Sequence, residues 1–541
     1  MSPPSIPKRR IPRVPLANVA GLLIATALIG QVLGFMRTKL INANFNNLHT
    51  PLSQNAGVYF AAFSIPDFFF YTIAAGALGV AFMPYLSDRL HKGDRKGVWE
   101  LSASLLNLLA ILMAFVAVII FLFAKPLIHH IVAPGLNEGQ LNNAATLMRL
   151  LALNPLLFTI SGVLTSTQQT MGRFFFYAIA PLFYNISIII SIYVFRNNIG
   201  IVGLGIGALI GAILQLIVVI IGSVRLDFHW HPKILWKNSE FRSMLKQLPP
   251  RSLDQGMDQL QSVVETNFAS NPVLGGATAI SNYNNAYVLH TAPILLIGTA
   301  ISTAAFPQLN KRLSQGRPDL FRKDFLMVMR AMIWITLPII IFSYFTRGYL
   351  ARLIFTNNNS DIALIFGFLT AAIFFRVLYA IISRWFYAQK DTRTPLMISI
   401  FTIAFNVYLA WRLSQPGAYG VAGLALAQSI VAAAEVIVLI LVMLVRDPKL
   451  FNMAFIGGVV RTVSVTGFSL VAGFVMISLY PLGIHDTGIV TLGGKLVAIG
   501  GVIGAVHIGM SALFGLEEAR PVIQRLKRLS GRLLRPVRVD L

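Results

Sequence analysis

The sequence has no cysteine among its 541 residues and few charged residues of either sign. The absence of cysteine excludes a disulfide framework, a thiol nucleophile and a cysteine-ligated metal. Charged residues make up 12% of the chain, whereas 56% of the residues are hydrophobic. Soluble globular proteins carry about 25% charged residues, and a water-soluble surface cannot be built from half that supply. The composition therefore predicts a polytopic membrane protein.

Signatures of common enzyme classes are also missing. The sequence contains no Walker A motif, no G-x-S-x-G, no H-E-x-x-H and no dinucleotide-binding fingerprint. The histidine clusters His129-His130 and His229-Trp230-His231 fall at predicted membrane interfaces rather than in a polar core. We therefore expect a transporter with no catalytic residues and no bound cofactor.

Apolar runs long enough to cross a bilayer, about 20 residues each, recur along the whole chain. They must be helical, because an open strand edge in hydrocarbon leaves backbone groups unpaired. The weakest run carries Arg251, Asp254, Asp258 and Glu265, and the count would be thirteen without it. The predicted fold is all-α, with fourteen spans at 16–42, 56–83, 101–124, 144–168, 174–195, 199–223, 251–270, 280–306, 325–346, 361–387, 394–412, 418–445, 454–480 and 490–515.

The distribution of basic residues favours fourteen spans. The net charge is +24, from 44 Lys and Arg against 20 Asp and Glu. With fourteen spans and a cytoplasmic N-terminus, 31 basic residues fall inside and five outside, or seven if Arg37 and Lys39 are counted there. This asymmetry follows the positive-inside rule, and removing one span would destroy it. We therefore predict that both termini are cytoplasmic and that the basic residues meet membrane lipids, not nucleic acid.

A weak internal repeat divides the spans into two lobes. AFMPYLSDRLHKG (81–93) and AAFPQLNKRLSQG (304–316) share P-x-L-x-x-R-L-x-x-G at an offset of 223. Two parallel lobes with a substrate site between them are a common transporter plan. The predicted segments are a basic cytosolic tail 1–15, an N-lobe 16–224 of six spans, an interfacial linker 225–249, a C-lobe 250–446 of six spans, two further spans in 447–515 and a basic amphipathic tail 516–541.

Polar residues inside the predicted spans are the candidate functional residues, since each charge near the bilayer centre costs about 2.5 to 3.5 kcal/mol or more. Helical spacing places Asp254, Asp258, Gln261 and Glu265 on one stripe of span seven, which should face a cavity. Glu265 is the member of that stripe that we assign to a coupling cation.

Three further polar residues in the later spans need partners or functions. Arg376 lies too deep in span ten to reach the interface, and Arg384 follows it on roughly the same side. Asn406 in span eleven offers an oxygen ligand to a cation such as sodium.

Several motifs, in order over nearly the whole chain, resemble the MurJ/MviN family of lipid II flippases, whose superfamily includes the MATE drug exporters. The resemblance implies transport of an undecaprenyl-pyrophosphate-linked peptidoglycan precursor across the bacterial cytoplasmic membrane by alternating access. The resemblance also implies that transport is coupled to sodium, protons or the membrane potential. It further implies contact with the cell-wall synthesis machinery. The motifs are VLGFMR (32–37), AFMPYL (81–86), VAPGL (132–136), STAAFPQL (302–309) and FYAQKDTRTP (386–395).

The resemblance carries over the family's cavity arginines, which would meet the pyrophosphate, only in part. One corresponds to Arg37, whereas the others fall on Gln31, on Phe70 and near Val288, and an acidic neighbour falls on Gly57. The resemblance thus implies substrate binding at Arg37 and Gln31.

Compensating and cation-binding residues are expected in the second half of the chain. Arg376 and Arg384 would replace the missing arginines, or the substrate differs. The family's sodium ligands correspond to Glu265 and Asn406, whereas a further acid one turn later is Ala410. Two alternatives stay open from the sequence: an exporter of another lipid-linked sugar or a drug, and a non-transporting envelope scaffold.

Overall fold

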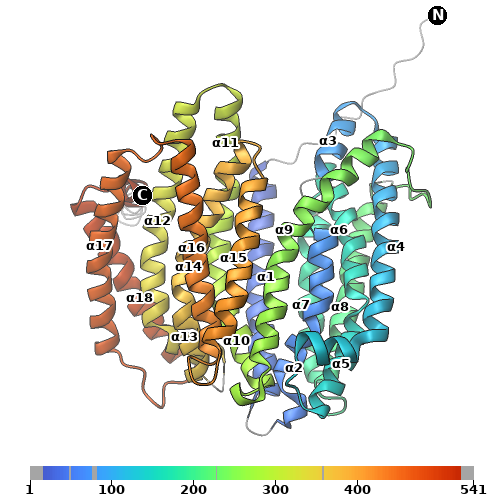
Figure 1. Ribbon diagram of the computed structural model, residues 1–541, viewed down its shortest axis with the longest axis horizontal. Coiled ribbons are helices and arrows are strands. Elements are labelled where there is room, and N and C mark those ends of the chain that lie inside the picture. The colour runs from blue at the N-terminus through green and yellow to red at the C-terminus, as the bar shows by residue number, and fades with distance from the viewer. Residues whose placement is uncertain (1–15, 48–49, 76–81, 227, 356–358, 526–541) are drawn as a thin grey trace, which may run out of the picture. The chain divides into compact units, whose positions relative to one another are not determined.

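The computed structural model describes residues 16–47, 50–75, 82–226, 228–355 and 359–525 (Figure 1). The side chains of 16–21, 24, 75, 247–255 and 359 are outside this description, and Asp254 is among them. The described residues form helices and connections without a strand, which confirms the all-α class. The helices are α1 (Leu16–Phe45), α2 (Ala56–Phe69), α3 (Met83–His91), α4 (Arg95–Leu127), α5 (Glu138–Leu151), α6 (Asn154–Thr170), α7 (Phe175–Phe195), α8 (Val202–Val224), α9 (Ser239–Ala269), α10 (Ala277–Pro293), α11 (Ala300–Ser314), α12 (Pro318–Phe345), α13 (Arg347–Ile354), α14 (Asn359–Ala388), α15 (Arg393–Leu413), α16 (Val421–Arg446), α17 (Met453–Leu479) and α18 (Gly488–Leu513).

Twelve helical segments among the described residues are long and apolar enough to cross a membrane, and each overlaps a predicted span. The chain is therefore a multi-pass membrane protein. The two predicted spans outside this set, 16–42 and 251–270, lie in α1 and α9, which are helices of 30 and 31 residues. A helix of that length reaches about 45 Å, enough to cross a bilayer. The total of fourteen stays a prediction.

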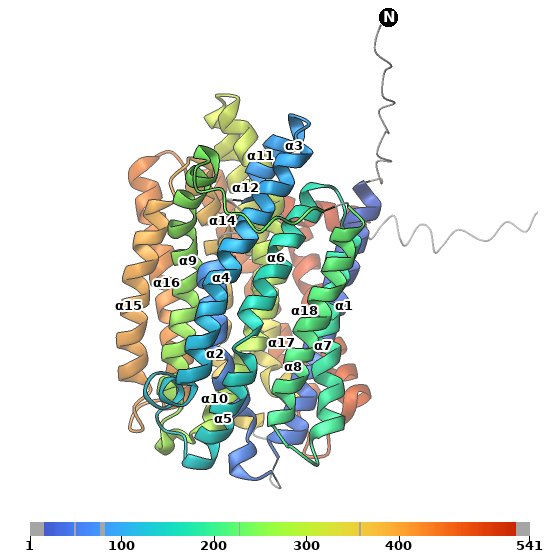
Figure 2. The same cartoon turned by 90° about the vertical axis from the view of Figure 1, so that its right-hand side faces the viewer.

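The chain separates into two compact units, of which unit 1 comprises 1–41, 65–124 and 145–256. In unit 1, α7 and α8 pack closely, with α6 against α8 (Figure 2). Glycine makes the first contact possible: a Cβ on Gly207 would lie 2.2 Å from Ser191 Oγ. Ser187 Oγ also donates to the Gly207 carbonyl (2.8 Å). Small residues let two helix backbones approach closely in lipid, where burial of apolar side chains gives no driving force.

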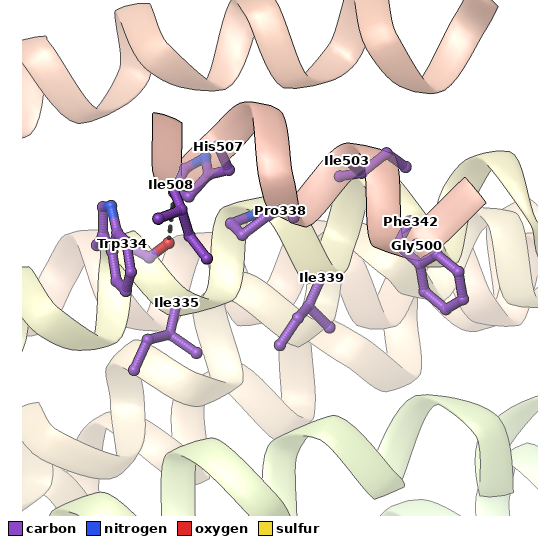
Figure 3. Close-up of a pocket in the computed structure, with 10 residues that line it drawn as sticks. Trp334, Ile335, Pro338, Ile339, Phe342, Gly500, Ile503, His507 and Ile508 are labelled. Atoms are coloured by element: carbon purple, nitrogen blue, oxygen red, sulfur yellow. Dashed lines mark hydrogen bonds between the residues drawn. The ribbon is translucent and has the colours of Figure 1, made fainter. Parts of the chain in front are cut away.

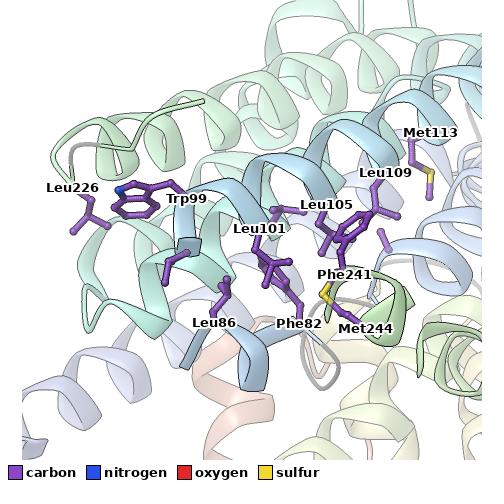
Figure 4. Close-up of a cluster of buried hydrophobic side chains, with 13 residues drawn as sticks. Phe82, Leu86, Trp99, Leu101, Leu105, Leu109, Met113, Leu226, Phe241 and Met244 are labelled. Carbon is purple, nitrogen blue, oxygen red and sulfur yellow. The ribbon is translucent and has the colours of Figure 1, made fainter. Parts of the chain in front are cut away.

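A buried apolar cluster in unit 1 fastens the predicted interfacial linker to α3 and α4 (Figure 4). Phe241 and Met244, at the start of α9, are fully buried against Leu101 and its neighbours. Arg89 of α3 adds an ion pair to Glu240 at 2.6 Å. The start of α9 is therefore packed into unit 1.

The two segments that share the repeated motif have matching local structures. Arg89 and Arg312, which correspond in the repeat, each bind a carboxylate, and the Arg312 Nε to Asp324 Oδ2 distance is 2.8 Å. Gly93 and Gly316 both take a positive φ, of 77° and 67°, where a side chain would be strained. The motif therefore has a structural reason: each glycine closes the turn between two helices, and each arginine binds a carboxylate of another helix.

Unit 2 comprises 42–64, 125–144 and 257–541. Within it, buried amides join the end of α1 to α10: Asn42 Nδ2 donates to Asn285 Oδ1 (2.9 Å), and Asn285 Nδ2 donates back to Asn42 Oδ1 (2.7 Å). Asn55 Nδ2 donates to Asn46 Oδ1 (3.1 Å). Hydrogen bonds of this kind, between side-chain amides of two helices, hold the helices together where no water competes.

The helices α12, α17 and α18 pack together at the C-terminal end of unit 2. An apolar pocket of ≈ 330 Å³ lies between α12 and α18, lined by residues that include Pro338, Phe342 and Ile503 (Figure 3). Buried His507 anchors its wall, with Nε2 3.1 Å from the Trp334 carbonyl oxygen and Nδ1 3.1 Å from Ser469 Oγ. None of the ionisable residues predicted to function lines this pocket.

Candidate functional site

Glu265 of α9 lies in a buried network of neutral donors in unit 2. Its side chain is 3% exposed, and its Oε1 accepts hydrogen bonds from Gln261 Nε2 (2.9 Å) and Gln428 Nε2 (3.1 Å). Gln261 is one turn earlier on α9, whereas Gln428 comes from α16. Of the predicted polar stripe, Gln261 and Glu265 therefore face protein, as expected for a charge that cannot face lipid.

Arg376 of α14 is paired with a carboxylate. Its Nη1 lies 3.6 Å from Glu435 Oε2, and the two side chains are 22% and 5% exposed. Ser399 of α15 donates to the other carboxylate oxygen at 2.8 Å. The ion pair explains how an arginine remains charged deep in a span, since each charge compensates the other. Glu435 belongs to α16, so this ion pair joins α14 to α16.

An aromatic row on α10 borders this charged cluster. Tyr283 and Tyr287 stack with ring centroids 6.3 Å apart, and Tyr287 lies 5.3 Å from the ring of His290. Tyr287 interacts electrostatically with Glu265, Arg376 and Asp258, so side chains of three helices, α9, α10 and α14, converge here. His290 and Tyr287 are site residues that the sequence reasoning missed. The spacing of four residues from Tyr283 to Tyr287 and of three from Tyr287 to His290 was the available signal.

Asn406 was predicted as a cation ligand together with Glu265. The Asn406 side chain is 1% exposed, and its Nδ2, like Gln428 Oε1, has no hydrogen-bond partner among the described atoms. Glu265 supplies one negative charge and Gln428 an unused oxygen. This donor set suits a proton or a monovalent cation, and it has too few carboxylates for a divalent one.

The predicted substrate-binding residues of α1 lie in unit 1. Arg37 is half-buried, and its Nε is buried without a hydrogen-bond partner among the described atoms. It interacts electrostatically with Asp67 of α2, an acid that the sequence reasoning did not single out. Gln31, almost two turns earlier, is exposed. Arg37 therefore retains unused hydrogen-bonding capacity inside a predicted span.

Arg384 differs from Arg376 in its surroundings, although both belong to α14. Its guanidinium lies over the ring of Phe306 at 5.2 Å, and its Nη2 donates to Thr303 Oγ1 at 3.4 Å. Among the described residues it forms no ion pair. Stacking on an aromatic ring leaves a guanidinium with free donors.

The motif FYAQKDTRTP forms the turn between α14 and α15. Asp391 accepts hydrogen bonds from Thr394 N (3.0 Å) and Thr394 Oγ1 (2.6 Å), and its carboxylate binds Arg446 Nη1 at 2.6 Å. Burial opposes ionisation of Asp391, but the bonds from Thr394 and Arg446 outweigh it and lower the pKa to about 2. Lys390 takes a positive φ of 61° to close the turn. The motif therefore fastens α15 to the end of α16.

Comparison with known proteins assigns the family. The family model described as "Lipid II flippase MurJ" matches residues 53–488. The chain belongs to the lipid II flippase MurJ family. Among curated relatives, the probable lipid II flippase MurJ of Borreliella burgdorferi is 22% identical over 441 residues, which cover 79% of this chain and 83% of the relative. The corresponding protein of Rickettsia prowazekii is 25% identical over 402 residues, 72% of this chain and 76% of the relative.

Solved structures confirm the fold. The inward closed conformation of a lipid II flippase MurJ superposes with a TM-score of 0.75 at 20% identity, covering 93% of this chain and 99% of that one. An inward-facing multidrug resistance MATE transporter of the MOP superfamily gives a TM-score of 0.66 at 16% identity, covering 79% of this chain and 98% of that one. The fold predicted from the resemblance to MurJ and its superfamily is therefore correct.

Proposed function

We propose that this MurJ family member is a flippase that moves lipid II across the bacterial cytoplasmic membrane by alternating access, for cell-wall synthesis. The supporting observation is the family match over most of the chain together with charged residues held inside the membrane-spanning helices. Transport needs such groups, because a polar head group must meet polar partners at membrane depth. The protein acts as a transporter and not as an enzyme.

Depletion and reconstitution test this function. The gene should restore growth to bacteria depleted of their own flippase, and the purified protein in proteoliposomes should move lipid II between leaflets. Failure in both assays would contradict the proposal.

Arg37 is the proposed contact for the pyrophosphate, with Gln31, Arg376 and Arg384 as further head-group contacts. Membrane lipids would meet the basic tail at 516–541, and cell-wall synthesis enzymes are the expected protein partners.

Glu265→Gln tests the proposed coupling site. Glu265 would carry a proton or a sodium ion, with Asn406 as the second ligand, and the exchange of this ion would drive or bias the cycle. We expect Glu265→Gln to slow translocation about tenfold, equivalent to 1.4 kcal/mol, and to remove its dependence on sodium or pH. Translocation would be measured in proteoliposomes across a range of sodium concentrations and pH, with expression as the control. Unchanged ion dependence in the variant would make Glu265 a structural residue.

The proposed topology places both termini in the cytoplasm. The chain has no cysteine, so single cysteines report without background. Cysteines at exposed Asn137 and Pro416 should react with an impermeant reagent from outside, whereas those at exposed Lys92 and Gln315 should react only after permeabilisation. Asn55 is unsuitable, since it is 7% exposed and would react poorly from either side. Labelling of Gln315→Cys from outside would overturn the two-lobe topology.

A further inference from the structure

The charged cluster of unit 2 has an excess of acid. Asp258, Glu265 and Glu435 all interact electrostatically with the single guanidinium of Arg376. Arg376 is paired with Glu435, and Glu265 is held by neutral amides. Asp258 makes no hydrogen bond or ion pair with another described residue. A carboxylate in a predicted span without such a partner costs free energy, and residues of this kind in membrane spans usually have a function.

Asp258 is accessible, unlike the other two carboxylates. Its side chain is exposed, whereas Glu265 and Glu435 are buried. Tyr287 is 39% exposed and interacts electrostatically with Asp258, so an exposed carboxylate and a partly exposed tyrosine belong to the same cluster. The two side chains therefore lie within electrostatic range of each other.

His290 adds an unused acceptor beside this pair. It is 2% exposed, its ring lies 5.3 Å from that of Tyr287, and neither of its ring nitrogens has a hydrogen-bond partner among the described atoms. A buried polar group left without a partner costs about 1–3 kcal/mol. A neutral imidazole can accept one hydrogen bond, so this cost would be recovered if a donor entered.

We propose that Asp258, Tyr287 and His290 form an amine site, which binds a primary ammonium group on the transported head group. An ammonium has three N–H donors and a full positive charge. The carboxylate neutralises the charge, the Tyr287 ring attracts it through its π face, and the imidazole accepts a hydrogen bond. An anionic group would instead meet three carboxylates against one arginine.

This inference rests on the proposed function and narrows its substrate class to lipid-linked head groups that carry an amine. The pyrophosphate contact proposed at Arg37 belongs to unit 1, whereas the amine site belongs wholly to unit 2. A sugar ring could stack on Tyr287 but would leave the charge of Asp258 uncompensated. An ammonium group compensates the charge of Asp258 and is also attracted by the Tyr287 ring.

The test compares two lipids that differ only in one amine. The purified full-length protein in detergent is titrated with lipid II whose peptide carries a lysine, and with the same lipid after acetylation of that side-chain amine. We expect the wild-type protein to bind the amine form about tenfold more tightly. Asp258→Asn and Tyr287→Leu should bind both lipids alike. Tyr287→Phe should retain the preference, because it keeps the aromatic face.

Matched controls separate the possible outcomes. Glu138→Gln removes an exposed carboxylate at the start of α5 and should keep the wild-type preference. Equal binding of the two lipids by the wild-type protein would overturn the amine site and assign the exposed ring to the sugar. A preference for the amine form that Tyr287→Leu retains would also overturn the amine site. If the wild-type protein binds neither lipid, lipid II itself is the wrong substrate, and the inference fails with it.

Discussion

Replacing Glu435 with leucine should lower the free energy of unfolding by about 3 to 5 kcal/mol, the largest effect expected of any single substitution proposed for this protein. Arg376 lies 3.6 Å from this carboxylate and would lose its ion-pair partner inside a span. Ser399, which donates to Glu435, would lose its acceptor as well. Unfolding would be followed by circular dichroism during titration of mixed micelles with a denaturing detergent.

The double variant Arg376→Leu/Glu435→Leu distinguishes an uncompensated charge from a packing defect. Replacing both members of a buried ion pair with apolar residues is often neutral or stabilising, so the double variant should recover most of the loss. If it is as unstable as Glu435→Leu, the ion pair is not the cause. Because Arg376 is also a proposed head-group contact, the double variant should fold but transport poorly.

Arg37→Ala is expected to reduce lipid II translocation between ten- and a hundredfold. Arg37 is the retained arginine among the positions that the resemblance assigned to pyrophosphate binding, and its buried Nε has no hydrogen-bond partner among the described atoms. A forked, charge-assisted contact to phosphate oxygens contributes about 1.5 to 3 kcal/mol, which corresponds to that loss. Translocation in proteoliposomes is the measurement, with membrane insertion and accumulation checked in parallel.

Arg37→Lys separates recognition from anchoring of α1. A lysine keeps the positive charge but cannot reproduce the forked geometry, so recognition predicts that it impairs translocation too. Asp67→Asn is the matched control. It removes the acid that interacts with Arg37 and should maintain or strengthen anion binding. Normal flipping by Arg37→Ala would move the pyrophosphate contact elsewhere.

The membrane fold was predictable from the sequence because lipid imposes a one-dimensional constraint. Each crossing needs about 20 apolar residues, and their runs can be counted along the chain. Twelve of the predicted spans overlap helices that meet the criteria of length and apolarity. The span at 251–270 is the instructive case: it lies in a 31-residue helix whose Gln261 and Glu265 face protein, which a count of apolar residues cannot detect.

The local role of several motifs was beyond sequence reasoning. FYAQKDTRTP is one of the motifs that carry the resemblance, yet its aspartate binds Arg446, 55 residues later. The asparagines at the end of α1 likewise pair with α10, 243 residues away along the chain. Partners at such separations are chosen by helix packing, and no periodicity in the sequence encodes them.

The sequence by itself determined the class of the protein, its helices and the presence of charges that need partners in the membrane. Composition and hydropathy suffice for this, since the cost of placing a polar group in lipid does not depend on its neighbours in the fold. The tertiary structure alone decided which charges are compensated. Arg376 is paired with Glu435, whereas Asp258 is not paired with a described residue, because compensation depends on distances of a few ångströms between helices far apart in the chain.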